Sequence, residues 1–300
     1  MSRFRASLGA SLTAVAVVAV AAVPSVLLPA RADAAPVVQR VGPADLGPAG
    51  PWLRLQDDPG NAGRPPGVQE VSPFADPVRF NGSLHLAVAG APEAQQAQAA
   101  HYFDSAVPLT TIAASPLSYD LYVKGATSTP GAIPYGANLQ LPTVCLGLFT
   151  TLSFQPQLAT DTQGRTGAVA DAWRHFDAGG SALWRTSRAV GPFAAQSDHP
   201  LSDYVSTCAT AGDGAIGVIA NVGRLGDATA SLDTYVDNLT VNGTVYDFAV
   251  LYTATGGITF GAFGGGGGNG GGDGSGSGYG RGHGPGYGSG YGGHANGGGL

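Results

Sequence analysis

The chain is short of charge, and above all of positive charge. Asp, Glu, Lys and Arg make up 11% of its 300 residues, Lys124 is the single lysine, and the formal net charge is −6. Proteins bind nucleic acid and anionic membranes through surfaces rich in Lys and Arg. We therefore expect neither nucleic acid nor an anionic membrane as a partner.

Catalytic signatures are scarce too. Glu70 and Glu93 are the only glutamates, and both lie outside the strand-rich centre of the chain. Glycosidases generally use two carboxylates that flank the scissile bond, and no paired spacing of aspartates stands out. The motifs His-Glu-x-x-His and Gly-x-Ser-x-Gly do not occur. We therefore predict that the protein is not an enzyme.

One stretch, 212–217, does fit the pattern Gly-x-Gly-x-x-Gly. A dinucleotide site needs a strand before this pattern and a helix after it. Here the apolar run Ala215–Val222 follows, which is typical of a strand. We interpret 212–217 as a turn that leads into a strand.

The N-terminus has the order of a secretory signal peptide. Arg3 and Arg5 precede a long uncharged apolar run, and Ala32-Asp33-Ala34 offers small residues at a cleavage site. This order predicts a signal peptide over 1–34 and a secreted protein, extracellular or associated with the cell wall. The alternative is an uncleaved membrane anchor. No later run reaches the ~20 apolar residues of a membrane span, so cleavage leaves no stable anchor.

Cys145 and Cys208 are the only cysteines. An even number of cysteines in an exported protein predicts a disulfide. The competing interpretation is a metal site, which a lone pair of cysteines without a nearby histidine disfavours.

Composition divides the rest of the chain. Residues 35–67 are rich in Gly-Pro, Pro-Gly and Pro-Pro steps and predict a linker. The sequence pattern over residues 68–255 predicts one folded domain. The tail 264–300 contains 22 glycines in 37 residues, too little apolar surface to offset chain entropy, and we expect it to be disordered. It is either a solvated spacer or, through its spaced tyrosines, a segment that associates with glycan or with its own copies.

Short β-rich runs alternate with turns over 68–250. In 117–123, one face carries Leu117, Tyr119, Leu121 and Val123. Further strands are predicted at 83–88, 138–144, 150–154, 168–176, 182–186, 215–222, 235–241 and 245–250, the last two joined by Asn242-Gly243. Two short helices are predicted, at Glu93–Tyr102 and Leu201–Cys208. The pattern is typical of an all-β antiparallel sandwich or barrel.

Several motifs are familiar in this order. They are PLTTI at 108–112, LSYDLYV at 117–123, PYGANLQL at 134–141, TLSFQP at 151–156, AWRHFD at 172–177, LW at 183–184, LSDY at 201–204, YVDNLT at 235–240 and YDF at 246–248. Over about 75–250 the chain resembles a β-sandwich domain common in exported proteins of GC-rich bacteria. It is similar in layout to jelly-roll carbohydrate-binding modules.

The resemblance implies a jelly-roll-like sandwich, in some members with a structural calcium, and no catalytic residues. It also implies that the N-terminal strand lies beside the C-terminal one, so 80–88 should pair near 244–248. The sequence departs from the pattern at Ala249, where an acidic residue often follows Asp-Phe.

The candidate ligand-binding residues flank one glycine-rich turn. Trp173 and Trp184 lie on either side of 178–181 and are expected to face each other across a hairpin. Aromatic faces stack on sugar rings. Arg174, His175 and Asp177 are placed to orient hydroxyl groups. The alternative is that both tryptophans belong to the core, where large aromatic residues usually lie.

No cofactor is predicted, although a structural calcium is possible. Calcium takes six to eight oxygen ligands. Asp237 and Asp247, where the terminal strands are expected to meet, are the best candidate ligands.

Two functions stay open at this stage. One is a non-catalytic module that binds glycan or cell-wall polysaccharide. The other is a structural or surface-associated protein with a protein-binding sandwich and a glycine-rich spacer. No feature of the sequence defines an oligomeric state.

Overall fold

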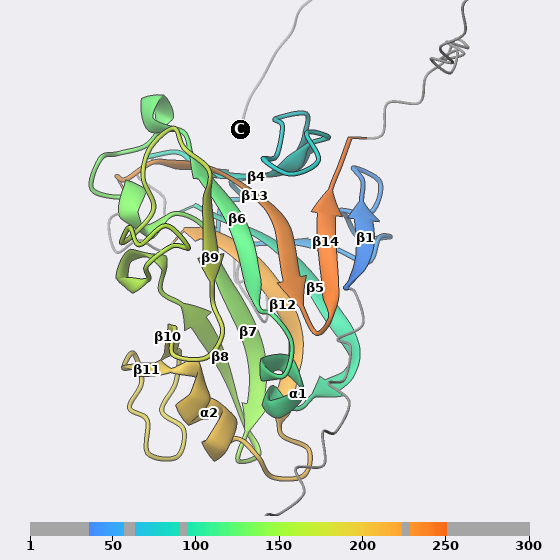
Figure 1. The fold of residues 1–300 in the computed structure, drawn as a ribbon, viewed down its shortest axis with the longest axis vertical. Helices are drawn as coiled ribbons and strands as arrows, with labels where there is room; N and C mark the ends of the chain where they lie inside the picture. Colours follow the sequence, from blue (N-terminus) through green and yellow to red (C-terminus); the bar gives the residue numbers. More distant parts are fainter. Residues whose placement is uncertain (1–35, 57–63, 91–94, 224–228, 251–300) are drawn as a thin grey trace, which may run out of the picture. The chain divides into compact units, whose positions relative to one another are not determined.

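A computed structural model describes residues 36–56, 64–90, 95–223 and 229–250. The expected signal peptide 1–34 and tail 264–300 lie outside the described residues. The architecture is all-β, with two sheets of seven strands each (Figure 1). This confirms the predicted sandwich.

The first sheet runs in the order β1-β14-β13-β4-β3, and β6 and β9 continue it from the other edge of β13. Its strands are β1 (Val37–Val41), β3 (Val68–Ser72), β4 (Ser83–Val88), β6 (Ser118–Val123), β9 (Arg174–Asp177), β13 (Leu232–Val241) and β14 (Thr244–Phe248).

The second sheet runs in the order β11-β10-β8-β7-β12-β5-β2. Its strands are β2 (Leu53–Leu55), β5 (Gln96–Val107), β7 (Asn138–Cys145), β8 (Leu148–Phe154), β10 (Leu183–Thr186), β11 (Asp198–Pro200) and β12 (Gly214–Gly223). Short helices connect strands: α1 (Leu109–Ala113), α2 (Leu201–Thr207), and the 3-10 turns η1 (Gly125–Thr127), η2 (Ile133–Tyr135) and η3 (Pro156–Leu158). No helix in the described ranges is both long and apolar enough to cross a membrane.

Alternation along the strands places the core. In β6, Tyr119, Leu121 and Val123 are fully buried between the sheets, as the sequence pattern predicts, while Tyr122 between them is only half-buried. The hairpin from β13 to β14 is also confirmed. Asn242 and Gly243 have φ of 50° and 75°, the left-handed pair that a two-residue hairpin turn requires.

The strand β13 has three partners. One edge of it pairs with β6. The other edge pairs first with β4, through Leu232–Val236, and then with β14, through Leu239–Val241. Asn238, between these two stretches, has φ of 48°. The sheet therefore has a junction at residues 237–238, where one strand edge passes from one neighbour to the next.

The predicted linker is wrong in the part that the structure describes. Val37–Val41 forms β1, which pairs in parallel with β14, and Leu53–Leu55 forms β2, which pairs with β5. Trp52 is fully buried, with Tyr246 and Phe248 edge-on at ring distances of 5.1 and 5.0 Å. Within the described residues the fold therefore begins at β1 and not at residue 68, because burial of Trp52 and strand pairing outweigh the local turn signals.

The expected pairing of 80–88 beside 244–248 is also wrong, because the segment predicted to be a linker supplies a strand. β1 takes the place beside β14, and β4 pairs with β3 and β13. A terminal strand does lie beside the C-terminal one, but it is an earlier segment than expected.

The helix expected at Glu93–Tyr102 is wrong where it is described. Gln96–Val107 is the strand β5, which pairs with β12 and β2. Ala97 and Ala99 are buried against the other sheet and let the two sheets approach closely. Helix propensity is a weak prior, and pairing on both edges overrides it. The helix expected at Leu201–Cys208 is confirmed as α2.

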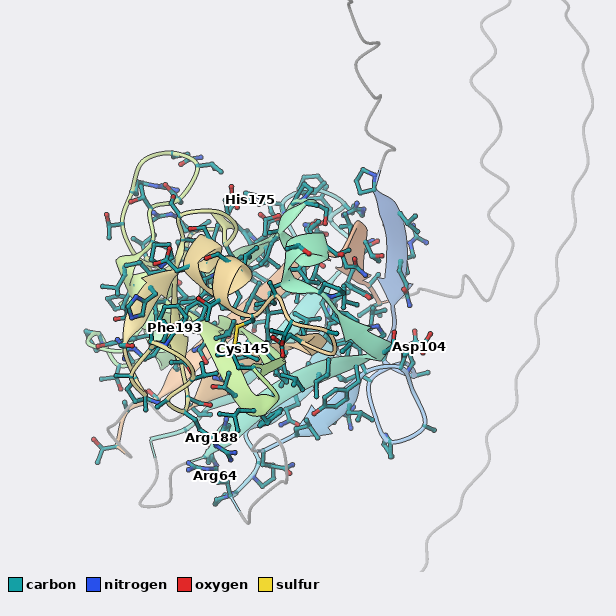
Figure 2. The ribbon with its side chains drawn as sticks, turned by 90° about the horizontal axis from the view of Figure 1, so that it is seen from below. Arg64, Asp104, Cys145, His175, Arg188 and Phe193 are labelled. Atoms are coloured by element: carbon teal, nitrogen blue, oxygen red, sulfur yellow. A yellow bond between two sulfur atoms is a disulfide. The ribbon has the colours of Figure 1, made fainter. Side chains whose placement is uncertain are left out.

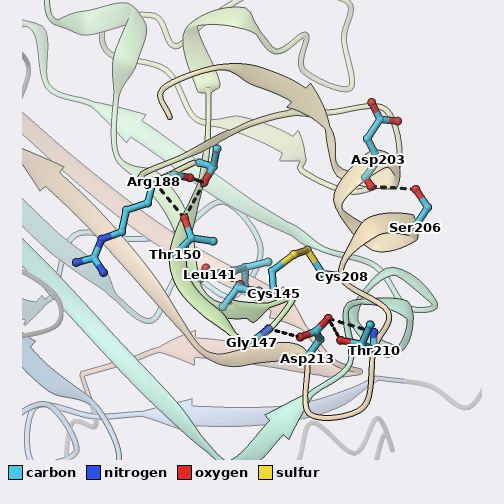
Figure 3. Close-up of a disulfide and its surroundings, with 12 residues drawn as sticks. Leu141, Cys145, Gly147, Thr150, Arg188, Asp203, Ser206, Cys208, Thr210 and Asp213 are labelled. Atoms are coloured by element: carbon cyan, nitrogen blue, oxygen red, sulfur yellow. Dashed lines mark hydrogen bonds between the residues drawn. A yellow bond between two sulfur atoms is a disulfide. The ribbon is translucent and has the colours of Figure 1, made fainter. Parts of the chain in front are cut away.

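The disulfide is present, and both cysteines are buried (Figure 3). It ties the end of β7 to the residue after α2. Beside it, Asp213 accepts hydrogen bonds from the backbone of Gly147 and from the hydroxyl of Thr210. The strand β12 begins at Gly214, so the stretch 212–217 is the turn leading into a strand that the sequence predicts.

Replacing Cys145 and Cys208 together by Ala should lower the free energy of unfolding by about 4 kcal/mol. The bond joins residues 63 positions apart, and a loop of that size restricts the unfolded chain by this amount in the chain-entropy model. Urea denaturation of the oxidised wild type and the double variant measures the difference. The reduced wild type is the control and should match the variant. A loss below about 1 kcal/mol would contradict the prediction.

Candidate functional site

The two candidate tryptophans lie on different sheets and do not form a pair. Trp184 belongs to β10 in the second sheet, and Trp173 directly precedes β9 in the first. The segment between them connects the two sheets instead of closing a hairpin. Trp184 is fully buried, and its Nε1 donates a hydrogen bond to the carbonyl of Ala178 at 2.8 Å. The core interpretation is therefore correct for Trp184, and the ligand-binding interpretation is wrong.

Trp173 is half-buried and lies on the outer side of the first sheet. Its indole ring contacts Tyr122 at 5.6 Å and Phe74 at 6.0 Å between centroids. Its Nε1 donates to the carbonyl of Ala75 at 3.2 Å. One edge of the indole is fixed by the loop 73–82, and the rest of the ring is partly open to solvent.

Alternation along β9 separates the polar candidates. Arg174 points inward, is 1% exposed, and forms an ion pair with the buried Asp161. Burial alone would raise the pKa of Asp161, but hydrogen bonds from Arg165 and Arg174 lower it overall. Arg174 therefore holds a loop inside the fold, and its predicted role in orienting hydroxyl groups is wrong.

His175 points outward and is half-exposed. Its Nδ1 lies 2.8 Å from Oδ1 of Asp120, and this hydrogen bond raises the pKa of His175. Asp177 is exposed and accepts a hydrogen bond from the backbone of Gly179 in the following turn. Of the five predicted ligand-binding residues, Trp173 and His175 thus lie on the outer face of the first sheet, and Asp177 lies at its end.

Strand pairing places an aromatic row on this outer face. His85 of β4 is directly opposite Tyr235 of β13, and Tyr235 is directly opposite Tyr122 of β6. The rings of His85 and Tyr235 are stacked at 4.5 Å, with an angle of 9° between their planes. Trp173 continues the row beyond Tyr122.

The loop 73–82 places a further ring over this row. Phe74 is stacked on Tyr235 at 4.2 Å and lies 4.8 Å from Tyr122. We call the five rings of Phe74, His85, Tyr122, Trp173 and Tyr235 the aromatic patch. Tyr235 is 7% exposed, while the other four are half-buried. The patch therefore presents ring surface to solvent at its Phe74, Tyr122 and Trp173 end.

Carboxylates surround the aromatic patch. Oδ1 of Asp171 accepts a hydrogen bond from the hydroxyl of Tyr122 at 3.2 Å. At the other end, His85 lies between Glu70 and Asp233, with ring nitrogens 3.2 and 2.8 Å from their oxygens. Both ring nitrogens of His85 therefore have a carboxylate within hydrogen-bonding distance.

A surface hollow adjoins the His85 end of the patch. It has a volume of about 540 Å³, and its lining includes Val68, Ala87, Gln95, Thr127, Ser231 and Asp233. Thr127 donates its hydroxyl hydrogen to Asp233 at 2.7 Å. The patch and the hollow together offer ring faces beside hydroxyl, amide and carboxylate groups, a mixture of apolar and polar groups that is typical of ligand sites.

The predicted calcium ligands lie at the β13 junction, fully buried. Oδ2 of Asp247 is 3.5 Å from Nε of Arg40 and 3.7 Å from Nε of Arg79, and it accepts a hydrogen bond from Asn81 at 3.1 Å. Oδ1 of Asp237 accepts a hydrogen bond from the backbone of Phe248 at 2.9 Å. In the described ranges, no three His, Cys, Asp or Glu side chains are placed to hold a metal ion. The calcium site stays a prediction, and the cations beside Asp247 are guanidinium groups.

Asp237 is the least compensated carboxyl of this cluster. Its Oδ2 has no hydrogen-bond partner in the described structure. Burial raises its pKa to about 8, aided by repulsion from Asp76 and Asp247 and opposed by backbone hydrogen bonds from Phe248 and Asn238. A proton on Asp237 removes the cost of a second buried negative charge beside Asp247.

Sequence reasoning missed Phe74, His85, Tyr122 and Tyr235. The available signal was the phase of the strands. In 83–88 and 117–123, His85 and Tyr122 lie on the strand face opposite the apolar residues. Tyr235 lies on the corresponding face of 232–241. Phe74 carries no such signal, because it is placed by a loop.

No protein-family model, curated protein or solved structure matches the chain.

Replacing Asp237 by Asn should change the free energy of unfolding, relative to the wild type, more favourably at pH 8 than at pH 5. The folded-state pKa of about 8 lies above the ordinary aspartate value of 3.8, so between these values the folded protein binds the extra proton. The wild type therefore loses stability as pH rises through this window, by at most about 1.4 kcal/mol per pH unit from this group. The Asn variant lacks this loss.

Urea denaturation at pH 5 and pH 8 measures the effect. Asp104→Asn, at an exposed carboxyl, is the control and should shift stability equally at both values. The same difference between Asp237→Asn and the wild type at both pH values would contradict the assignment.

Proposed function

We propose that the protein is a secreted, non-catalytic module that binds glycan or cell-wall polysaccharide through the aromatic patch. The observation that carries this proposal is the register of the patch. Strand pairing aligns His85, Tyr235 and Tyr122 in one row on the outer face of a sheet, and Trp173 continues it.

The geometry of the row suits a polymer better than a single small molecule. Neighbouring strands are about 4.8 Å apart, so the row from Glu70 to Tyr122 crosses three strand gaps and spans about 14 Å. Ring faces stack on the C–H surfaces of sugars, and the flanking Glu70, Asp171 and Asp233 can accept hydrogen bonds from hydroxyl groups. The carboxylates also disfavour acidic polymers.

Export is part of the same proposal. The described fold begins with β1 at Val37, so cleavage after Ala34 would remove the apolar N-terminus without touching the sheet. The single disulfide uses both cysteines, as suits an oxidising compartment.

A second candidate is a surface protein that binds other proteins, and the edge strand β1 favours it. β1 is an edge strand of the first sheet among the described strands, and its Val37 and Val38 are 67% and 48% exposed. An exposed apolar edge strand can pair with a strand of a partner. Capture of protein and not of polysaccharide would favour this alternative.

Replacing Trp173 by Ala should weaken retention on insoluble polysaccharides and isolated cell walls about fivefold. One stacked aromatic ring contributes about 1 kcal/mol beyond plain burial, which corresponds to that factor. The half-buried position of Trp173 predicts only a small loss of stability. Retention is measured by sedimentation with the solid polymer, and stability by thermal unfolding.

Two variants serve as controls for Trp173→Ala. Leu158→Ala removes an apolar side chain that is 46% exposed and outside both the patch and the loop 73–82, and should leave retention unchanged. Trp184→Ala should cost ~3–5 kcal/mol of stability, because Trp184 is a core residue. Unchanged retention of Trp173→Ala on every polymer that retains the wild type would refute the patch as the binding surface.

Protein recovered from the culture medium should begin at Ala35. The intact mass under non-reducing conditions should correspond to residues 35–300 with no free thiol. A protein that keeps residues 1–34 and stays with the membrane fraction would show that the N-terminus is an anchor.

A further inference from the structure

The outer face of the second sheet carries its own row of polar residues. Gln140 of β7 is directly opposite Ser153 of β8, Ser153 is opposite Arg185 of β10, and Arg185 is opposite Asp198 of β11. Their neighbours along the strands, Leu139, Leu141, Leu152, Trp184 and Thr186, are buried in the core. The row therefore faces away from the first sheet.

This row is partly exposed to solvent toward its Asp198 end, the open end, and at its Gln140 end, the covered end, it continues into buried amide side chains. Asn138, Gln140 and Ser153 are half-buried. The side chains of Arg185 and Asp198 are 35% and 24% exposed, and two hydrogen bonds of 2.7 and 2.6 Å join them.

An aromatic ring accompanies the open end. Tyr135, which is 43% exposed, lies near Arg185. The open end thus combines amide, hydroxyl, ion-pair and aromatic groups.

The covered end is a chain of amides from three strands. Asn221 of β12 donates to Asn138 at 3.1 Å and accepts from Gln96 of β5 at 2.9 Å. Gln98 of β5 reaches Gln140 at 3.4 Å. The amides link the covered strands to the open row.

Two amide oxygens of this chain have no hydrogen-bond partner in the described structure. They are Oε1 of Gln96 and Oε1 of Gln98, in side chains that are 2% and 1% exposed. A buried acceptor without a hydrogen-bond partner destabilises the fold. Because both side chains are almost fully buried, the donor that would remove this cost is a water that bridges to a hydroxyl group of a ligand on the open row, and not the ligand itself.

We infer that this face is a second carbohydrate-binding face, for a neutral polysaccharide chain that lies across the strands. Side-chain amides offer both donors and acceptors, as sugar hydroxyl groups do. The amides are uncharged, and Arg185 and Asp198 neutralise each other, so the row has no net charge to attract an acidic polymer. From Gln140 to Asp198 it crosses three strand gaps, about 14 Å, which is room for more than one sugar.

The two rows lie on opposite sides of the sandwich. Figure 2 shows His175, which follows Trp173 in the first sheet, and Arg188, which follows β10 in the second, on opposite sides of Cys145. A molecule with two such faces can bridge two polysaccharide chains. Binding at the second face is independent of the aromatic patch, whereas bridging rests on the proposed function of the patch as well.

Affinity electrophoresis in gels that contain hydroxyethylcellulose, glucomannan or xylan tests the second face. Gln140→Ala removes the central amide, and Ser153→Ile blocks the row with a residue that suits a strand. Both should weaken the retardation about three- to tenfold on the polymer that retards the wild type. Gln163→Ala, at an exposed glutamine in the loop 161–165, is the matched control and should have no effect.

Trp173→Ala and the double variant Trp173→Ala/Gln140→Ala separate the two faces. Partial loss in each single variant and complete loss in the double variant would support two sites. Loss only in Trp173→Ala would leave the patch as the binding site and overturn the second face. Loss only in the Gln140 and Ser153 variants would support the second face and refute the patch.

Thermal unfolding distinguishes binding from strand pairing. If the amides only hold β5, β12 and β7 together, Gln140→Ala will lower the melting temperature and leave retardation unchanged, which would overturn the inference. Wild type that none of the three polymers retards would overturn it too. Turbidity of a soluble polymer, produced by wild type and lost in either single-face variant, would support bridging.

Discussion

The junction on β13 is the constraint on which the first sheet depends. One edge of this strand has to serve β4 and β14 in succession, and the passage between them interrupts the ladder of backbone hydrogen bonds. Buried side chains supply hydrogen bonds in place of those that the ladder loses. Asp237 accepts a hydrogen bond from the backbone N–H of Phe248, and Asn238 donates one to Asp120. The junction therefore buries a group of carboxyls. Their negative charge is compensated by Arg40 and Arg79 and by a proton on Asp237.

The loop 73–82 follows from the same junction. Its end is tied there, because Asn81 donates to Asp247 and accepts from the backbone of Val250. Its beginning then lies over the neighbouring strands, where Phe74 stacks on Tyr235. The buried ion cluster and the aromatic patch are therefore two ends of one structural element, which couples stability to the binding that we propose. Substitutions in the loop have to be judged by folding as well as by binding.

Each sheet presents a row of polar or aromatic side chains on its outer face, and the two rows consist of different groups. The first has aromatic rings surrounded by carboxylates, while the second has amides and one neutral ion pair. Both rows arise from residues directly opposite one another on adjacent strands, so both depend on register. A shift of one residue in any of these strands would turn the row inward and the core outward. Packing of residues such as Leu121 and Trp184 thus also fixes the positions of the surface groups.

Local pattern determined much of this protein in advance. The alternation in 117–123 predicts the apolar side chains that β6 contributes to the core, Asn242-Gly243 predicts the hairpin from β13 to β14, and two cysteines after a predicted export signal predict the disulfide. These signals act between near neighbours or through composition, so they can be read from the sequence. Tertiary structure alone decided that Val37–Val41 pairs with β14, that 96–107 is a strand, and that Trp184 is buried while Trp173 is not. It also decided which outward residues form a row, because that depends on the pairing of strands up to about 150 residues apart, such as β4 with β13, and burial and pairing of that kind outweigh local propensity.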